Sequence, residues 1–262
     1  TTTSANTPAS GGTTNTAAIA LTFTLSESSS DFAVADIAAS GCSLGSLSGS
    51  GSSYSATCTA SSSGAVTINV AANGFTDSVG NGNTVATQYA WTYDGTAPTV
   101  SSATMSDTTL IEGETATLTI VFSEAVASFA SNDDVDCDSG SLAVMTSGNS
   151  ITWTGTFTPT AETSDTSNTC DIAASYTDTI GNSGGTGATA NYIVDGVDPE
   201  INSVSFSDTA MITGDTPTLT IVFSEAVAAF ASAADVTCAT GSLAAMSSSD
   251  DITWTGTFTP TA

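Results

Sequence analysis

The chain repeats itself every 101 residues, and this repeat limits its fold more than any other feature. The segment ITWTGTFTPTA at 151–161 recurs without change at 252–262, an offset of 252 − 151 = 101 residues. The segment TLTIVFSEAV at 117–126 recurs at 218–227 with the same offset. A period of this length is close to the size of one small domain, so the chain is predicted to be an array of similar domains.

A diverged first copy precedes the two similar ones. LTFTLSESSSDF at 21–32 aligns with LTIVFSEAVASF at 118–129, and an Asp-x-x-Gly-Asn segment occurs at both 77–81 and 178–182. The third copy stops about two-thirds of the way through its repeat. We therefore predict three domains, at residues 1–96 (diverged), 97–197 and 198–262 (truncated).

Apolar residues alternate with other residues inside each copy. In the second copy Leu118, Ile120 and Phe122 are separated by single residues, which places one face of a strand in a core. About seven short antiparallel strands in about 100 residues predict an all-β fold of tandem immunoglobulin-like β-sandwich domains in an extended rod. Strands of the second copy are expected near 101–105, 116–122, 128–137, 141–145, 151–158, 169–176 and 188–194.

Four of the repeated segments carry a family resemblance. TLTIVFSEAV, ITWTGTFTPTA, TDTIGN and DGVDP together resemble the bacterial immunoglobulin-like repeats of giant surface proteins and adhesins. The resemblance covers essentially the whole chain and is closest from residue 97 onward. It implies an extracellular rod of stacked domains, often stiffened by calcium. The first copy departs from the pattern, because SESSSDF replaces SEAVASF and Tyr54 takes the place of the tryptophan.

Charge excludes several classes of function. The chain has no Lys, Arg or His against 26 acidic residues, which gives a formal net charge of −26. Nucleic acid and anionic membrane surfaces are excluded as partners because both require cationic side chains, whereas hard divalent cations are favoured. A serine or cysteine nucleophile would lack its histidine base, and a phosphate site would lack its lysine or arginine. We therefore predict that the chain is not an enzyme.

Two kinds of segment are not visible in the chain. No stretch approaches the roughly 20 consecutive apolar residues of a transmembrane helix, so membrane insertion is not expected. The chain starts at Thr1 without a methionine, so we expect a processed segment with its targeting sequence upstream. The location that the family resemblance implies is extracellular or at the cell surface.

Cysteines agree with an oxidising compartment. Five are present, and we predict disulfides Cys42–Cys58 in the first copy and Cys137–Cys170 in the second. Cys238 is the counterpart of Cys137, and its partner is expected outside the chain. A metal–thiolate site is the alternative, but it would need CxxC-like spacing or histidine ligands, and the sequence has neither.

Repeated carboxylates are predicted to bind Ca²⁺ at the domain junctions. The seven strands of such a sandwich are lettered A to G in chain order. The loop after strand B and the loop between strands F and G then lie at the end where the preceding domain joins. Their oxygens suit calcium, although Asp and Gly are also favoured in turns that bind nothing. The predicted ligands are Asp94, Glu124 and Asp178 at the first junction, Asp195, Asp198 and Glu225 at the second, and Glu27 and Asp77 at the same end of the first copy.

Two further groups have alternative interpretations. Trp153 and Trp254 are expected in the core, with a carbohydrate-binding platform as the alternative. An acidic cluster of the second copy is expected on a solvated strand edge, where it would discourage edge-to-edge pairing, with a separate calcium site as the alternative. That cluster consists of Asp133, Asp134, Asp136 and Asp138.

Three functions remain open at this stage. The first is an extracellular spacer or stalk in a long repetitive surface adhesin, whose partners are neighbouring repeats of the same protein. The second is a segment of a self-assembling filament or matrix, in which identical chains pack into a fibre. The third is a module that binds glycans or a host protein through the loops of one domain.

Overall fold

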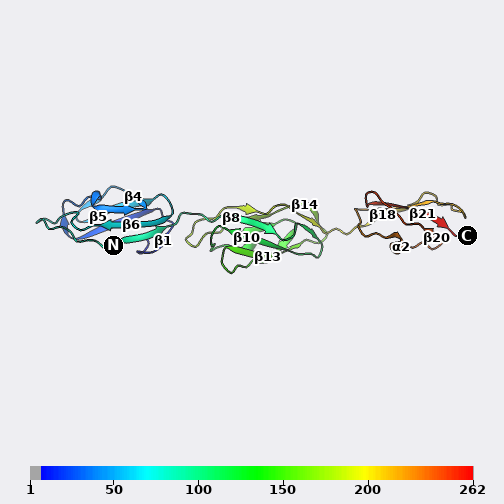
Figure 1. Cartoon of the computed structure of the whole chain (residues 1–262), viewed down its shortest axis with the longest axis horizontal. Helices are drawn as coiled ribbons and strands as arrows, with labels where there is room; N and C mark the ends of the chain where they lie inside the picture. The colour runs from blue at the N-terminus through cyan, green and yellow to red at the C-terminus, as the bar shows by residue number, and fades with distance from the viewer. Residues whose placement is uncertain (1–6, 262) are drawn as a thin grey trace. The chain divides into compact units, whose positions relative to one another are not determined.

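The computed structural model describes residues 7–261. It is an all-β protein of tandem immunoglobulin-like domains, and the strands of each sequence copy form sheets only with strands of the same copy (Figure 1). We call the copies repeats 1, 2 and 3. By their internal contacts, the described residues up to 160 together with 165–194 form one compact unit, which holds repeats 1 and 2. Residues 161–164 and the described residues from 195 onward form a second unit, which holds repeat 3.

Repeat 1 is a sandwich of two sheets, with strand orders β2-β5-β4 and β1-β7-β6-β3. Alternation along its strands buries Ile19, Leu21, Cys58 and Val66 between the sheets together with Trp91. Its elements are β1 (Thr13–Thr14), β2 (Ala18–Ser29), the 3-10 turn η1 (Val34–Asp36), β3 (Ile37–Ser40), β4 (Cys42–Leu44), β5 (Ser48–Ala60), β6 (Gly64–Val70) and β7 (Tyr89–Tyr93).

Repeat 2 follows the same plan with more strands. One sheet has the order β12-β13-β10-β8, and two short three-stranded sheets, β11-β15-β16 and β14-β17-β9, lie opposite. Leu118, Ile120 and Phe122 of β10 are buried, as their alternation predicts. The strands are β8 (Val100–Met105), β9 (Thr109–Ile111), β10 (Ala116–Phe122), β11 (Val135–Cys137), β12 (Gly140–Leu142), β13 (Thr152–Pro159), β14 (Ser164–Asn168), β15 (Cys170–Ile172), β16 (Gly187–Ala188) and β17 (Tyr192–Asp195).

Repeat 3 contributes one four-stranded sheet, of order β18-β19-β21-β20, within the described residues. Its small core contains Leu219, Ile221, Phe223 and Met246. The elements are β18 (Ile201–Phe206), β19 (Thr218–Phe223), the helical turn α2 (Ser232–Asp235), β20 (Gly241–Leu243) and β21 (Thr253–Pro260).

One predicted strand of repeat 2, at 128–137, is wrong over its first half. The helical turn α1 (Ser131–Asp134) occupies that stretch, and only Val135–Cys137 is extended. Asp134 is the reason, because its carboxylate accepts the backbone N–H of Ala130 across the turn at 2.7 Å and lies 4% exposed. Asp134 is therefore not part of a solvated strand edge. Asp133 and Asp136 do remain exposed.

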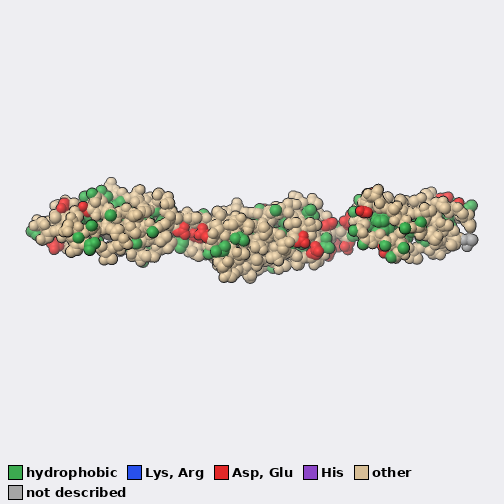
Figure 2. Space-filling view, in the orientation of Figure 1, with side chains coloured by type: hydrophobic (Ala, Val, Ile, Leu, Met, Phe, Trp, Pro, Cys, Tyr) green, Lys and Arg blue, Asp and Glu red, His purple; other side chains and the backbone are tan. Residues whose placement is uncertain are grey.

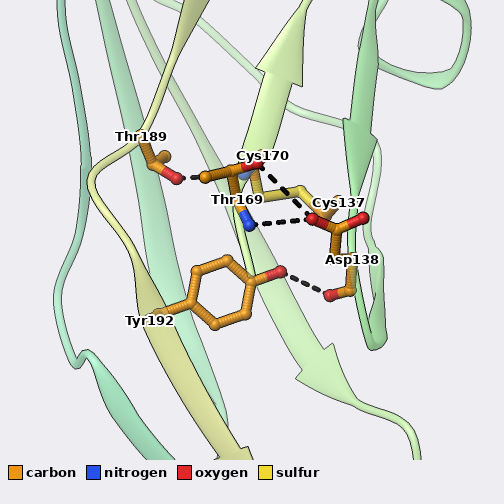
Figure 3. The surroundings of a disulfide bond; sticks show 6 residues. All are labelled: Cys137, Asp138, Thr169, Cys170, Thr189 and Tyr192. Carbon is orange, nitrogen blue, oxygen red and sulfur yellow. Dashed lines mark hydrogen bonds between the residues drawn. A yellow bond between two sulfur atoms is a disulfide. The ribbon is translucent and has the colours of Figure 1, made fainter. Parts of the chain in front are cut away.

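Both disulfides predicted within the chain are formed, and each links two strands of one sheet. Cys137 of β11 lies opposite Cys170 of β15, and the bond closes a sequence separation of 33 residues (Figure 3). Around it, Tyr192 donates a hydrogen bond to the main-chain oxygen of Asp138, and the carboxylate of Asp138 accepts the N–H of Thr169 at 2.9 Å. Cys42 of β4 is bonded to Cys58 of β5 over 16 residues. Cys238 is free.

The tryptophans pack against the cores. Trp153 is half-buried, with its ring centroid 5.0 Å from that of Phe129. Trp254 repeats this contact with Phe230, also at 5.0 Å. The core interpretation of these residues is therefore correct.

Candidate metal centre

Three carboxylates of the first unit converge at the junction of repeats 1 and 2. Asp94 directly follows β7, Glu124 follows β10, and Asp178 lies in the loop between β15 and β16. One carboxylate oxygen from each lies within 4.8 Å of the other two. Acidic side chains gather at this junction in Figure 2, and the sequence has no Lys, Arg or His to neutralise them.

Asp178 is the fixed member of the group. Its side chain is 2% exposed, and its Oδ1 accepts backbone N–H groups from Ile180, Gly181 and Asn182 at 2.7, 2.6 and 2.9 Å. The loop can wrap around the carboxylate because Gly181 takes φ of 97°, a conformation that costs glycine little. Burial by itself would raise the pKa of Asp178, but the side-chain hydrogen bond from Asn182 and these backbone bonds lower it. Asp178 is therefore held as an anion.

Two hydrogen-bonded links hold the connecting segment against repeat 2, one at the Asp178 loop and one at the end of β10. Asn182 donates to Asp178 Oδ2 at 2.7 Å and to the main-chain oxygen of Asp94 at 3.0 Å. Five residues further on, Thr99 donates its N–H to Ser123 Oγ, and Ser123 returns its own N–H to the oxygen of Thr99, both at 2.9 Å. The carboxylates of Asp94 and Glu124 are thereby brought to Asp178 by the backbone itself.

Glu124 is the member without a partner. Within residues 7–261 no hydrogen bond reaches its carboxylate, although the residue is half-buried. Burial raises its pKa, and the neighbouring charges of Asp94 and Asp178 raise it further. A carboxylate in this position is destabilised when it ionises, unless a cation is supplied from outside the chain.

The chemistry of this group suits a hard divalent cation. Three carboxylates offer up to six oxygens, and loop carbonyls and water can supply the remainder. Calcium accepts six to eight oxygen ligands in flexible geometry, whereas magnesium requires a near-ideal octahedron. An irregular set drawn from one linker and two loops therefore favours calcium.

The other predicted ligands are not assembled in this way. Among the described residues, the structure gathers no group of three carboxylates from Asp195, Asp198 and Glu225. The two hydrogen bonds between Thr99 and Ser123 do have counterparts there. Glu200 donates its N–H to Ser224 Oγ at 2.8 Å, and Ser224 donates its N–H to the main-chain oxygen of Glu200. The position corresponding to Asp178 falls outside the 262 residues.

In repeat 1, Asp77 forms the same loop as Asp178. Its carboxylate accepts the side-chain amide of Asn81 and the backbone N–H groups of Asn81 and Val79, each between 2.8 and 2.9 Å. The hydrogen bonds from Asn81 are the main reason that the pKa of Asp77 is lowered. Glu27 joins no group of three carboxylates in the described part of the chain.

Sequence reasoning missed two contributors to these loops. Asn182 is the amide that joins Asp178 to the linker, and the repeated Asp-x-x-Gly-Asn segment was the signal that could have identified it. Asp31 accepts hydrogen bonds from Ser29 and from the N–H and hydroxyl of Thr76, which lower its pKa to about 2. Ser29 lies two residues from Asp31, but Thr76 lies 45 residues away, so no local pattern indicates the contact with Thr76.

None of the helices within the described residues is long and apolar enough to cross a membrane.

Comparisons with known proteins give one family and two solved structures with weak similarity. The family model of the bacterial Ig-like domain matches residues 1–93, 94–194 and 195–262. The solved structure of FdeC, described as a broadly conserved Escherichia coli adhesin, is 12% identical, with a TM-score of 0.35, over 98% of this chain and 86% of that one. Invasin, described as a bacterial integrin-binding protein, is 14% identical, with a TM-score of 0.38, over 97% of this chain and 54% of that one. The chain thus spans about half of that invasin structure. A search of curated proteins found no match.

Proposed function

The chain belongs to the bacterial Ig-like domain family, and we propose that it is a stalk segment of a long repetitive surface adhesin, outside the cell or at its surface. Three matches in tandem along 262 residues support a structural role, because repetition of one framework is what a spacer requires. Neighbouring repeats of the same protein are its main partners in this role.

The observation that carries the mechanism is the convergence of Asp94, Glu124 and Asp178 within 4.8 Å. We propose that Ca²⁺ bound there joins the linker to both loops and stiffens the junction of repeats 1 and 2. The ion would supply the positive charge that a chain of net charge −26 lacks, and it would oppose bending by holding Asp94 against repeat 2.

Calcium titration of the full chain by calorimetry tests this proposal. We expect binding with Kd of roughly 0.1–1 mM, the range of extracellular calcium modules. Glu124→Gln should weaken binding at this site at least about tenfold, because it removes one of three carboxylates. Glu225→Gln is the matched control, since Glu225 has the same repeat position but belongs to no gathered triad among the described residues. Equal losses in the two variants would contradict the proposed site.

Electron microscopy and limited proteolysis test the mechanical role. With calcium, the segment 94–99 should resist chymotrypsin or thermolysin, and repeats 1 and 2 of single chains should keep a narrow range of angles. Chelator should widen that range and expose the segment to cleavage. Identical digestion patterns in both conditions would reject calcium stiffening, and ordered multi-chain fibres would favour a filament-forming segment instead.

A further inference from the structure

Residues 11–14 of repeat 1 run beside β7, the last strand of the same repeat, and in the same direction. The strand β1 within this segment pairs in parallel with β7. We call the backbone hydrogen bonds between residues 11–14 and residues 90–94 the terminal ladder. It includes the bonds from the N–H of Gly11 to the oxygen of Ala90 at 2.7 Å, from Thr92 to Gly12 at 2.9 Å and from Asp94 to Thr14 at 2.9 Å.

The two sides of the terminal ladder are held very differently. On its other edge β7 pairs antiparallel with β6, and Trp91 at the centre of β7 is 2% exposed in the core. Within residues 7–261, β1 lies at the edge of its sheet and pairs with β7 alone. The terminal ladder is therefore what fastens β1 to the rest of repeat 1.

Parallel pairing decides how the terminal ladder responds to tension. In a chain that is pulled from both ends, tension reaches residues 11–14 from their N-terminal side and leaves β7 through Asp94. Because the two strands are parallel, these two points lie at opposite ends of the ladder. Tension then slides one strand along the other and loads all the hydrogen bonds together. Strands pulled apart from one shared end would instead lose their bonds one at a time.

Repeat 2 contains a counterpart of this ladder. There β9 pairs with β17, and Ile193 donates its N–H to the oxygen of Thr108 at 2.8 Å. Ile193 lies 101 residues after Thr92, so the bond corresponds to the one between Thr92 and Gly12. The pairing of the first and last segments thus belongs to the framework of the repeat.

The disulfide of repeat 1 lies outside the terminal ladder. Cys42 and Cys58 belong to the sheet β2-β5-β4, which contains neither β1 nor β7. The bond therefore carries little of the tension while the ladder holds. Once the ladder breaks and the repeat unravels, the bond keeps the 16 residues that it encloses from extending.

We propose that the terminal ladder of repeat 1 carries the tension when the chain is pulled from its ends, and that the Cys42–Cys58 disulfide then limits the length released. The ladder sets the force at which the repeat opens, and the disulfide sets how far it extends. This inference rests on the proposed stalk role, because a stalk is the kind of segment that is pulled from end to end.

Single-molecule force measurements on the full chain, held at its two ends in chelator, test the ladder. The N–H and C=O of one strand residue point to the same edge, so Thr14 directs both toward β7 and Thr13 directs both away. Thr14→Pro should raise the unfolding rate of repeat 1 at a fixed force about tenfold, because proline removes one donor of the ladder. Thr13→Pro is the matched control and should change the rate by less than about twofold.

Two further checks belong to this comparison. Both prolines lie in an edge strand, where proline is tolerated, and thermal unfolding followed in repeat 1 verifies that each variant folds. Thr14 Oγ1 also accepts the N–H of Thr16 at 3.1 Å. Thr14→Ala removes this side-chain bond and keeps the ladder, so it should resemble Thr13→Pro.

The length released on unfolding tests the disulfide. Cys42→Ala with Cys58→Ala should lengthen the extension of repeat 1 by roughly 55 Å, because 16 more residues become free to extend. Cys137→Ala with Cys170→Ala should lengthen that of repeat 2 by roughly 115 Å, because that bond encloses 33 residues. The two increments also identify which repeat has opened in each recording.

Either of two results would overturn the proposal. One is an equal effect of Thr13→Pro and Thr14→Pro on the unfolding rate, since the ladder would then not set the force. The other is an unchanged extension in the Cys42→Ala and Cys58→Ala variant. Both leave the stalk role standing, because that role is judged by whether chains appear singly or as ordered fibres in electron microscopy. Ordered fibres together with a force-sensitive Thr14→Pro variant would reject the stalk and retain the ladder.

Discussion

Repeats 1 and 2 build the same sandwich but bury the matching strands β2 and β10 to different extents. In repeat 2, β8 pairs with β10 and contacts β16, which buries Ile120 and Phe122. In repeat 1, β1 pairs with β7 as β9 pairs with β17, and the matching side chains of β2, Phe23 and Leu25, are half-exposed. The difference teaches that alternation fixes the inward face of a strand, whereas the size and packing of the surrounding side chains decide how completely that face is buried.

The disulfides differ between the two repeats as well. Repeat 2 joins β11 to β15, and repeat 1 joins β4 to β5, in the other sheet. By strand register, Cys58 lies opposite Leu44 just as Phe157 lies opposite Leu142. Both Cys58 and Phe157 are 0% exposed, so the sulfur of repeat 1 occupies a position that an aromatic ring fills in repeat 2.

The largest expected effect comes from truncating the same core position in both repeats. Phe122→Ala should cost about 4 kcal/mol of unfolding free energy in repeat 2, because the ring is buried against Phe129 and Tyr176. Leu25→Ala should cost only about 1 kcal/mol in repeat 1, because its side chain is already half-exposed. Denaturant unfolding followed by hydrogen exchange in each repeat measures both. Equal costs would show that Leu25 is packed as completely in solution as Phe122.

Removing the disulfides should have the next largest effect. Cys137→Ala with Cys170→Ala should destabilise repeat 2 by about 3 kcal/mol. The bond spans 33 residues against 16 for Cys42–Cys58, so loop entropy alone makes its loss costlier by about 0.6 kcal/mol. Urea unfolding of each double variant, resolved by repeat, gives the two values. A greater loss in repeat 1 would show that the packing of Cys58 outweighs the chain-entropy difference.

A smaller effect is expected from the aspartate that closes the helical turn α1. Asp134→Ala should cost about 2 kcal/mol, because it leaves the half-buried N–H of Ala130 without its acceptor and removes the partner of Ser175. Asp36→Ala in repeat 1 should cost about 1 kcal/mol, since Asp36 makes the same bond to Ala33 in a more exposed setting. Thermal unfolding compares the two, and a larger loss for Asp36→Ala would contradict the burial argument.

Most of the framework could be predicted from the sequence because it depends on local patterns. Alternation identified β10 and β13, and the 101-residue offset identified the repeats. The helical turn α1 could not be predicted, because Asp134 looks like any acid on a strand until its bond to Ala130 is known. The short strands β9 and β14 were missed for other reasons: the three residues of β9 are too few to show alternation, and the five residues of β14 are polar and mostly exposed.

Part of the candidate site could also be predicted, because it depends on the topology of the sandwich. Topology alone placed Asp94, Glu124 and Asp178 at one end of repeat 2, because loops at the same end of a sandwich must meet. The roles of Asn182 and Asp31 depend on contacts between residues far apart in sequence. Such contacts leave no periodic signal in one sequence.

The smallest predicted effect concerns the protonation of Glu124. Its folded pKa is raised above the ordinary value of 4.5, mainly by burial and then by Asp94 and Asp178. The folded state therefore binds the proton of Glu124 more tightly than the unfolded chain does. The free energy of unfolding that this carboxyl contributes is fully present below about pH 4.5 and is lost as the pH rises through the folded pKa. At pH 7 in chelator, Glu124→Gln should thus stabilise repeat 2, by on the order of 0.5 kcal/mol.

Thermal scans of Glu124→Gln and Glu27→Gln at pH 4 and pH 7 check this. The gain for Glu124→Gln should fade at pH 4, where the wild-type carboxyl is largely protonated, and Glu27→Gln should change little, since Glu27 belongs to no gathered triad in the described structure. Millimolar calcium should reverse the sign at pH 7, because the ion stabilises the wild type through the carboxylate that the variant lacks. A gain for Glu124→Gln that persists in calcium would mean that repulsion at this junction is real but no ion relieves it.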